Sequence, residues 1–137
     1  SGVGYGMKEF ADNAFDGMRK PFIASGGSND VGRVNPGGME GREWRKQPYF
    51  LSPDIDKYAV ITEGSDHYLG GLICNAERGG EPDYEALAIV RTTSVIFLDA
   101  YLKDDAKAMQ YLATADIASL TQGQASYQYS RSGKFGR

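Results

Sequence analysis

The sequence predicts an α/β fold with parallel strands and flanking helices, in which the sheet is incomplete. Two short apolar segments run directly into glycines, which is typical of buried parallel strands that end at loops. A connection of crossover length separates them, as parallel strands require. A long segment with 3.6-residue apolar periodicity then indicates a helix on the sheet. Because two parallel strands leave both edges open, we expect further strands upstream or on a partner chain.

The elements up to the second strand follow in order. Residues 1–20 open with alternating glycines and then carry apolar residues at the spacing of a short amphipathic helix. The first strand is expected over 22–25, and the glycine pair after it marks its end. The connection is rich in Gly and Pro and holds a candidate helix over 40–49. The second strand is expected over 57–63, where β-branched and aromatic residues dominate.

The clearest helix in the sequence covers 83–103. Its apolar residues are expected to form one stripe on the sheet, broken only by Arg91. The stripe consists of Tyr84, Leu87, Ala88, Val95, Leu98, Tyr101 and Leu102. A second helix is expected over about 105–114, because acidic residues at its start suit the positive end of the helix dipole.

The last part of the chain has little to bury. From Ser119 onward it is rich in Gln, Ser, Gly and Tyr, so we expect loop or partial disorder there. The predicted organisation is therefore one domain over 1–118, the C-terminal portion of a larger domain, followed by a polar tail over 119–137.

Composition limits the class of partner. The chain has 137 residues, 41% of them apolar, and a formal net charge of −3. Basic residues form no stripe, which argues against nucleic acid, and no apolar run is long enough for a membrane span. A neutral or weakly polar small molecule fits better. The first residues lack the features of a signal peptide, and a single cysteine does not indicate a redox environment. The cellular compartment therefore stays unknown.

The only cysteine, Cys74, forms no disulfide within the chain and has no second cysteine with which to build a structural zinc site. We therefore expect a buried or inert thiol, since free cysteine usually behaves as a small hydrophobic residue. The sequence predicts no metal site.

The candidate chemistry lies in the two loops that follow the strands, because open α/β sheets place their sites at the carboxyl ends of parallel strands. The first loop ends at Asp30 and the second contains His67, the only histidine. A histidine can act as general base and acid, and a carboxylate bonded to its far nitrogen fixes the tautomer. The alternative is a surface histidine and a turn aspartate with no catalytic role.

Asp66, next to the histidine, competes with Asp30 for the role of acid. Adjacent residues rarely point at each other, so Asp66 is expected to bond to loop backbone instead. Tyr68 and Leu72 follow the histidine and are candidates for one wall of a substrate pocket, on position alone.

A group of basic and aromatic residues in the connection has two interpretations. They line an acyl- or acid-binding cleft, or they cover the candidate helix and its loop. The second interpretation is favoured, because arginine stems pack readily on apolar surface. The group consists of Arg33, Arg42, Trp44 and Arg45.

The strand-end segments also carry a resemblance to a known family. Residues 20–30 read Lys-Pro-Phe-Ile-Ala-Ser-Gly-Gly-Ser-Asn-Asp, and 56–67 read Asp-Lys-Tyr-Ala-Val-Ile-Thr-Glu-Gly-Ser-Asp-His. With the helix over 83–103, they resemble the last third of α/β-hydrolases related to dienelactone hydrolases and bacterial esterases. The resemblance implies that Asp30 matches the triad acid and His67 the triad histidine. It also implies a small-molecule ester substrate and no cofactor.

The nucleophile of that family is missing. The Gly-x-Ser-x-Gly elbow would precede the acid, and this chain contains no such pentapeptide. The oxyanion-hole segment, upstream in the family, is missing as well. We therefore expect a serine ester hydrolase to which this chain supplies the acid and histidine, with the N-terminal part of the same hydrolase as its partner. The alternative is a non-catalytic α/β-hydrolase-like fragment or binding subunit, and whether the chain is an enzyme stays open.

Overall fold

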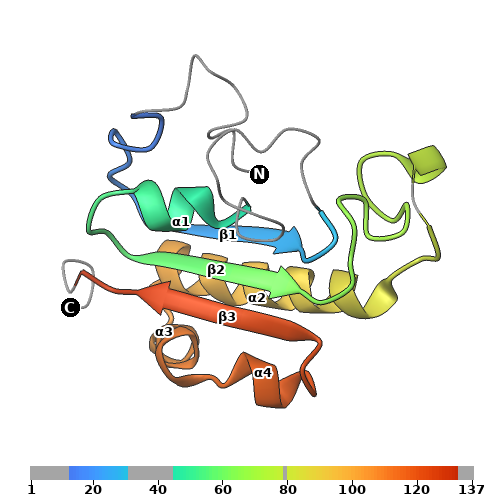
Figure 1. Ribbon diagram of the computed structural model, residues 1–137. Helices are drawn as coiled ribbons and strands as arrows, with labels where there is room; N and C mark the ends of the chain where they lie inside the picture. Colours follow the sequence, from blue (N-terminus) through green and yellow to red (C-terminus); the bar gives the residue numbers. More distant parts are fainter. Residues whose placement is uncertain (1–12, 31–44, 79, 133–137) are drawn as a thin grey trace.

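The structure, a computed structural model, describes residues 13–30, 45–78 and 80–132. Within these residues one mixed sheet has the order β1 (Phe22–Gly27), β2 (Lys57–Thr62), β3 (Ala125–Ser130). The β1 and β2 strands are parallel, and β3 is antiparallel to β2 (Figure 1). The α/β fold and the pair of parallel strands are confirmed, and the antiparallel strand is an addition to the prediction.

Helices flank this sheet, and the long α2 crosses one face of it (Figure 1). The helical elements are α1 (Gln47–Leu51), the short 3-10 helix η3 (Ala76–Arg78), α2 (Tyr84–Leu102), α3 (Ala106–Thr114) and α4 (Ile117–Leu120). The last three each begin after an aspartate whose carboxylate accepts hydrogen bonds from backbone N–H groups of the first turn. The helices predicted over 83–103 and 105–114 are confirmed, and their bounds differ from the prediction only by the capping residues.

The two remaining helix predictions fall partly outside the described residues. The helix expected over 40–49 begins at Gln47 and ends at Leu51, and residues 40–44 are not described. For the helix expected near the start of the chain, residues 13–17 form turns, and 1–12 are not described.

Strand β2 is the centre of the core. Tyr58 and Val60 are fully buried and point to the same face of the sheet, since they lie two positions apart. Tyr58 packs with Ala100 of α2 and Leu112 of α3, and Val60 packs on α4 and β3. One sheet face therefore carries both apolar clusters.

The stripe expected to pack α2 on the sheet was wrong for most of its residues, although Tyr101 does pack against the core at Tyr58. Tyr84, Val95, Leu98 and Leu102 of that stripe are 69%, 49%, 47% and 76% exposed. The side that faces the sheet instead contributes Ala86, Thr93, Ile96, Phe97 and Ala100. The helix is apolar on two sides, so periodicity alone did not select the buried one. No helix among the described residues has the length and apolar character to cross a membrane.

The loop or disorder expected from Ser119 onward was also wrong, because β3 forms there. The hydroxyls of Tyr127 and Tyr129 donate to backbone carbonyls of Leu112 and Ala113, both at 2.7 Å. Both tyrosine rings stack against Tyr58, with centroids 6.2 and 6.3 Å away. The segment packs tyrosine rings rather than aliphatic side chains against Tyr58, and the tyrosine hydroxyls are hydrogen-bonded to α3.

Beyond β3, Ser132 binds the start of β2. Its backbone N–H and its hydroxyl donate to Oδ1 of Asp56 at 2.8 and 3.1 Å. Tyr101 of α2 donates to Oδ2 of the same fully buried carboxylate at 2.7 Å. This carboxylate therefore connects the C-terminal strand, β2 and α2.

Candidate active site

The two loops that follow β1 and β2 are bonded to each other. The N–H groups of Ser28 and Asn29 donate to the carbonyls of Thr62 and Ser65 at 2.9 and 3.0 Å. The Asn29 side chain donates to the Gly64 carbonyl at 2.8 Å, and the Gly64 N–H donates to Ser28 Oγ at 2.7 Å. These bonds continue the pairing of the strands past their ends and hold the loops in one arrangement.

Glycines permit this close approach. A Cβ atom on Gly27 would lie 2.0 Å from the carbonyl oxygen of Ser65, so no side chain fits at that position. Gly64 has a φ of +76°, a left-handed conformation that glycine adopts without strain. The glycines that mark the strand ends in the sequence thus have a local steric role.

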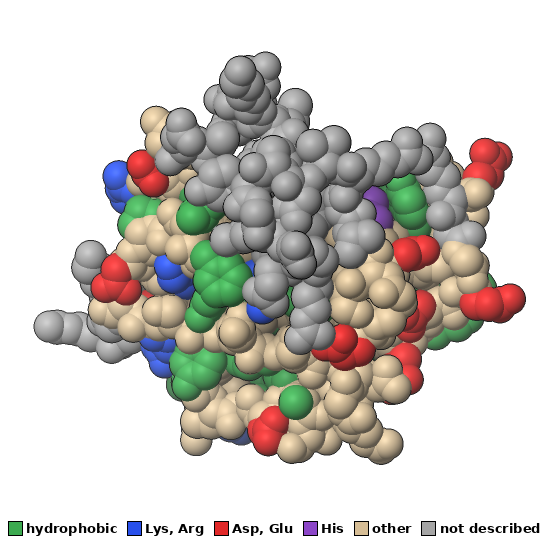
Figure 2. All heavy atoms as spheres, viewed as in Figure 1, with side chains coloured by type: hydrophobic (Ala, Val, Ile, Leu, Met, Phe, Trp, Pro, Cys, Tyr) green, Lys and Arg blue, Asp and Glu red, His purple; other side chains and the backbone are tan. Residues whose placement is uncertain are grey.

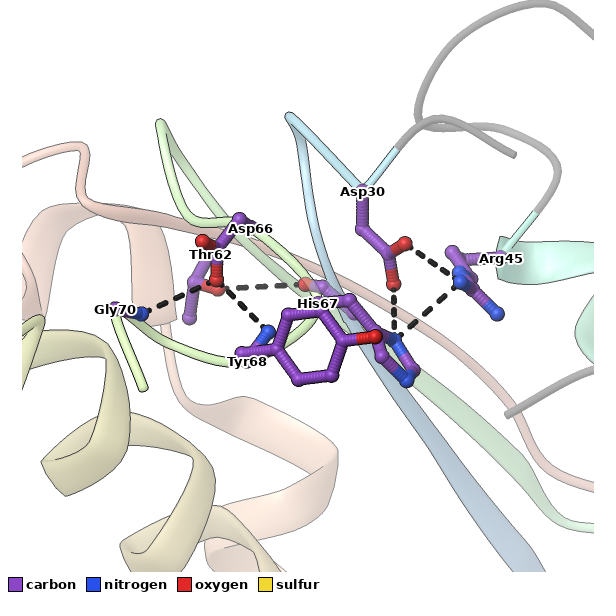
Figure 3. A network of polar contacts seen from close by, with 8 residues as sticks. Asp30, Arg45, Thr62, Asp66, His67, Tyr68 and Gly70 are labelled. Carbon is purple, nitrogen blue, oxygen red and sulfur yellow. Dashed lines mark hydrogen bonds and ion pairs between the residues drawn. The ribbon is translucent and has the colours of Figure 1, made fainter. Parts of the chain in front are cut away.

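The histidine loop is shaped by its own aspartate. Oδ1 of Asp66 accepts hydrogen bonds from the N–H groups of Tyr68 and Gly70 at 2.8 and 3.1 Å. The expectation that Asp66 bonds to loop backbone rather than to His67 is confirmed. This turn presents the imidazole on the other side of the loop from the Asp66 carboxylate (Figure 3).

The same loop is attached to the first turn of α2. The hydroxyl of Ser65 donates to Oδ2 of Asp83 at 2.6 Å, while Oδ1 of Asp83 accepts the N–H of Ala86 at 2.9 Å. The carboxylate therefore caps the helix and anchors the histidine loop at once. Neither Ser65 nor Asp83 was singled out in the sequence, although an aspartate before a helix is a recognisable cap signal.

Asp30 and His67 meet at the ends of the parallel strands. Oδ2 of Asp30 lies 2.9 Å from Nδ1 of His67 (Figure 3). The aspartate side chain is 8% exposed and the histidine side chain 39% exposed. The buried carboxylate thus bonds to the inner ring nitrogen, and Nε2 makes no hydrogen bond to any described residue.

Arg45 is a third member of the cluster. Its Nη2 lies 2.5 Å from Oδ1 of Asp30 and 3.3 Å from Nδ1 of His67, and its side chain is 11% exposed. A guanidinium only donates and a carboxylate only accepts, so Nδ1 cannot bond to both in one protonation state. The shorter contact assigns the proton to Nδ1, directed at Asp30.

The sequence favours a covering role for Arg45 and gives no indication of this contact. The structure brings its side chain into the site, whereas Arg33, Arg42 and Trp44 lie outside the described residues. No spacing signal links position 45 to the strand ends, because the contact depends on the path of the connection.

A cavity of about 240 Å³ borders the pair. Its lining includes Ser25, Asp30, His67, Leu69, Ile73 and Cys74. In the space-filling view the purple imidazole reaches the surface beside a hydrophobic side chain (Figure 2). The cavity lining thus combines the polar side chains of Asp30 and His67 with aliphatic side chains that could contact an apolar group.

The predicted pocket residues Tyr68 and Leu72 lie beside this lining and not in it. The Tyr68 ring packs edge-on against the His67 ring, with centroids 5.0 Å apart. Their predicted contact with substrate stays a prediction. The lining instead takes Leu69 and Ile73 from the same loop.

Cys74 differs from its expected environment. The thiol was expected to be buried or inert, but the residue is exposed and borders the cavity. Its φ of 61° places its backbone in the left-handed region. The expected burial was wrong because the turn after Leu72 leaves this side chain outside both apolar clusters.

The arrangement can take and return a proton. The Nδ1 side of the ring is fixed by a carboxylate, and Nε2 is available as the base. Among residues 13–30, 45–78 and 80–132, no serine hydroxyl or thiol is hydrogen-bonded to His67, and no group of three or more possible metal ligands occurs. The described site is therefore an aspartate–histidine pair, with no nucleophile bonded to it among the described residues.

Comparisons of this chain with protein-family profiles, with curated proteins and with solved structures find no match. The resemblance to α/β-hydrolases stays a prediction, and a functional proposal rests on the geometry of the site.

Proposed function

We propose that the chain is part of a serine ester hydrolase of the α/β-hydrolase type, to which it contributes the acid Asp30 and the base His67. One observation carries the proposal: the 2.9 Å contact between Asp30 Oδ2 and His67 Nδ1, beside a cavity at the carboxyl ends of two parallel strands. Ligand sites of open α/β sheets form at such strand ends.

In this proposal the serine belongs to the N-terminal part of the hydrolase. As its oxygen forms a bond to the ester carbonyl carbon, His67 takes the serine proton on Nε2. The imidazolium then gives that proton to the departing alcohol oxygen as the bond between this oxygen and the carbonyl carbon breaks. A water molecule then attacks the acyl-enzyme, and His67 takes a proton from the water and returns it to the serine oxygen. This step releases the carboxylic acid product and the free serine. Asp30 holds the ring throughout and stabilises its charged form.

The cavity indicates the kind of substrate. Its 240 Å³ lie below the range of about 300–1,000 Å³ of complete ligand sites, as expected if another part of the hydrolase adds a wall. Leu69 and Ile73 suit an apolar acyl or alcohol group, and Asp66 in the lining opposes an anionic one. The proposed substrate is therefore a small neutral ester.

Fluorophosphonate labelling of the native preparation tests the proposal, with intact-mass analysis of every polypeptide present. We expect a label on a serine of the N-terminal part, lost in His67→Ala because the serine is no longer activated. The control Gln110→Ala replaces an exposed residue of α3 and should label like the wild type.

Two results would contradict the proposal. A label that persists in His67→Ala would show that the histidine does not activate the serine. The absence of both a label and a second polypeptide would favour the non-catalytic alternative, in which the cavity binds a small molecule without converting it.

A further inference from the structure

We infer that Arg45 is a positioning residue of this site: it holds one carboxylate oxygen of Asp30 and thereby directs the other at Nδ1 of His67. The inference rests on the proposed function for its catalytic meaning. The positioning itself is a statement about the described side chains and has its own test.

Among the described side chains, Arg45 and His67 contact different oxygens of the Asp30 carboxylate. Oδ1 faces Nη2 of Arg45 at 2.5 Å, and Oδ2 faces Nδ1 of His67 at 2.9 Å. The ion pair with Arg45 opposes rotation of the carboxylate about its Cβ–Cγ bond. Turning it here breaks an ion pair between side chains only 8% and 11% exposed, where water competes weakly.

This division also determines which ring nitrogen is the base. A neutral imidazole carries one N–H, and a nearby carboxylate favours that proton on Nδ1. A guanidinium that donated to Nδ1 would favour the opposite tautomer, in which Nε2 carries the proton and cannot act as a base. Arg45 lies 3.3 Å from Nδ1, close enough for this alternative, and its ion pair with Oδ1 of Asp30 holds it in the productive arrangement.

The backbone around Arg45 is fitted to this position. A Cβ atom on Gly26 of β1 would lie 2.9 Å from Cβ and 3.1 Å from Cγ of Arg45. The absence of a side chain at Gly26 therefore lets the arginine stem lie against the strand. The next residue, Lys46, donates from Nζ to Oε1 of Gln128 in β3 at 3.0 Å, which anchors the segment on the sheet.

The test uses the full ¹⁵N-labelled chain, in which His67 gives the only imidazole signal. Long-range ¹H–¹⁵N correlation spectra at a pH where the ring is neutral report its tautomer. We expect the wild type to show the Nδ1–H form. Arg45→Met removes a competing donor to Nδ1, but it also frees the Asp30 carboxylate to turn away from that nitrogen. If holding the carboxylate is the main role of Arg45, the Nε2–H fraction should rise several-fold, and Arg45→Lys should restore part of the wild-type spectrum. Arg19→Met, which removes an arginine bonded only to carbonyls of its own turn, should change nothing.

A second variant keeps the positive charge of Arg45 but changes the position of its side chain. Gly26→Ala should displace the Arg45 stem and raise the Nε2–H fraction by a smaller factor. If Arg45→Met does not fold, Gly26→Ala and Arg45→Lys decide the question. A wild-type tautomer in the folded Arg45→Met or Gly26→Ala chain would overturn the inference, as would a wild type that is already Nε2–H.

The Asp30→Asn variant and the labelling experiment separate the possible failures. If Asp30→Asn changes the tautomer and Arg45→Met does not, Asp30 orients the ring unaided and the inference is wrong. If the tautomers behave as expected and no serine is labelled, the positioning stands and the hydrolase proposal fails.

Discussion

Asp30 and His67 are 37 positions apart in the sequence, and 2.9 Å separate the carboxylate oxygen from the ring nitrogen. The contact exists because β1 and β2 are parallel neighbours whose last paired residues are Gly27 and Thr62. Each functional side chain stands a few residues past the end of its strand. The pair therefore depends on sheet register, on two short loops and on the bonds between them.

In the proposed hydrolase, replacing Asp30 with Asn should abolish most of the activity. The amide removes the charge that stabilises the imidazolium, and its NH₂ group cannot accept the hydrogen bond of whichever partner it faces, Arg45 or His67. We expect kcat for a small neutral ester to fall by about 10⁴-fold, as for the corresponding change in other triads.

The matched control for that variant is Asp104→Asn, which removes the same charge from the exposed connection between α2 and α3. It should keep wild-type kcat. Equal activity of Asp30→Asn and Asp104→Asn would show that Asp30 has no role in the reaction.

Gly27→Ala should destabilise the fold and separate the two loops. The added methyl group would lie 2.0 Å from the Ser65 carbonyl oxygen, so the backbone must shift. Overpacking of this kind costs about 1–3 kcal/mol in the free energy of unfolding. Urea denaturation measures the loss. Gly17→Ala meets no atom within 4 Å and should cost little; a similar loss in both variants would contradict the steric explanation.

The Asp83 carboxylate caps α2 and holds the histidine loop through Ser65. The variants Ser65→Ala and Asp83→Ala should separate these two roles. Asp83→Ala removes the cap of α2, which costs about 1 kcal/mol, and also releases the histidine loop. Ser65→Ala releases the loop alone. Both should alter the His67 ring signals, whereas Asp105→Ala, which removes the α3 cap, should lower stability and leave those signals unchanged. An unaltered ring in Ser65→Ala would show that this bond does not hold the site.

Because of Tyr101, the free energy of unfolding should depend on pH in the alkaline range. Burial, followed by its hydrogen bonds with Tyr58 and Asp56, raises the pKa of Tyr101 far above its usual value of 10.0. In the unfolded chain the phenol ionises near that usual value, while in the folded chain it keeps its proton. The stabilising contribution is therefore complete below pH 10 and declines as pH rises above it.

Tyr101→Phe should flatten that decline and cost about 1–2 kcal/mol at neutral pH, since Asp56 loses a hydrogen-bond donor. Thermal unfolding across the alkaline range measures both effects. Tyr84→Phe, a change in a side chain 69% exposed, serves as the control. A decline of the same steepness in Tyr101→Phe and the wild type would contradict the assignment.

Ending the chain at Gln124 should abolish cooperative folding. The truncation removes β3, which exposes one edge of β2 and the apolar side chains beside it, Tyr58 and Val60, and leaves Asp56 without its Ser132 donors. Circular dichroism and gel filtration of the truncated chain measure the effect. A cooperative transition near the wild-type temperature would show that residues 125–132 are dispensable, as a polar tail would be.

The sequence was sufficient for the elements with strong local signals. Strands β1 and β2 end at or near glycines, and α2 and α3 begin after capping aspartates, so both their type and their order were predictable. The meeting of Asp30 and His67 followed from the general placement of sites at parallel strand ends.

Other features depend on contacts that no local pattern records. Strand β3 consists of tyrosines alternating with serine and glutamine, and its low aliphatic content concealed a period-two pattern. Both sides of α2 are apolar, so only the tertiary structure shows which side faces Tyr58. Arg45 enters the site through the path of the connection, which the spacing of residues does not specify.

The register of β1 and β2 has a consequence for how this protein can vary. The strands are paired residue by residue from Phe22 with Lys57 to Gly27 with Thr62, and Asp30 and His67 lie beyond the last pair. An insertion of one residue between Gly27 and Asp30 would leave every strand pair intact and would move the carboxylate away from the imidazole. If the proposed function holds, the lengths of these two loops are constrained by the chemistry rather than by folding, so a chain that has lost the Asp30–His67 contact can keep its fold.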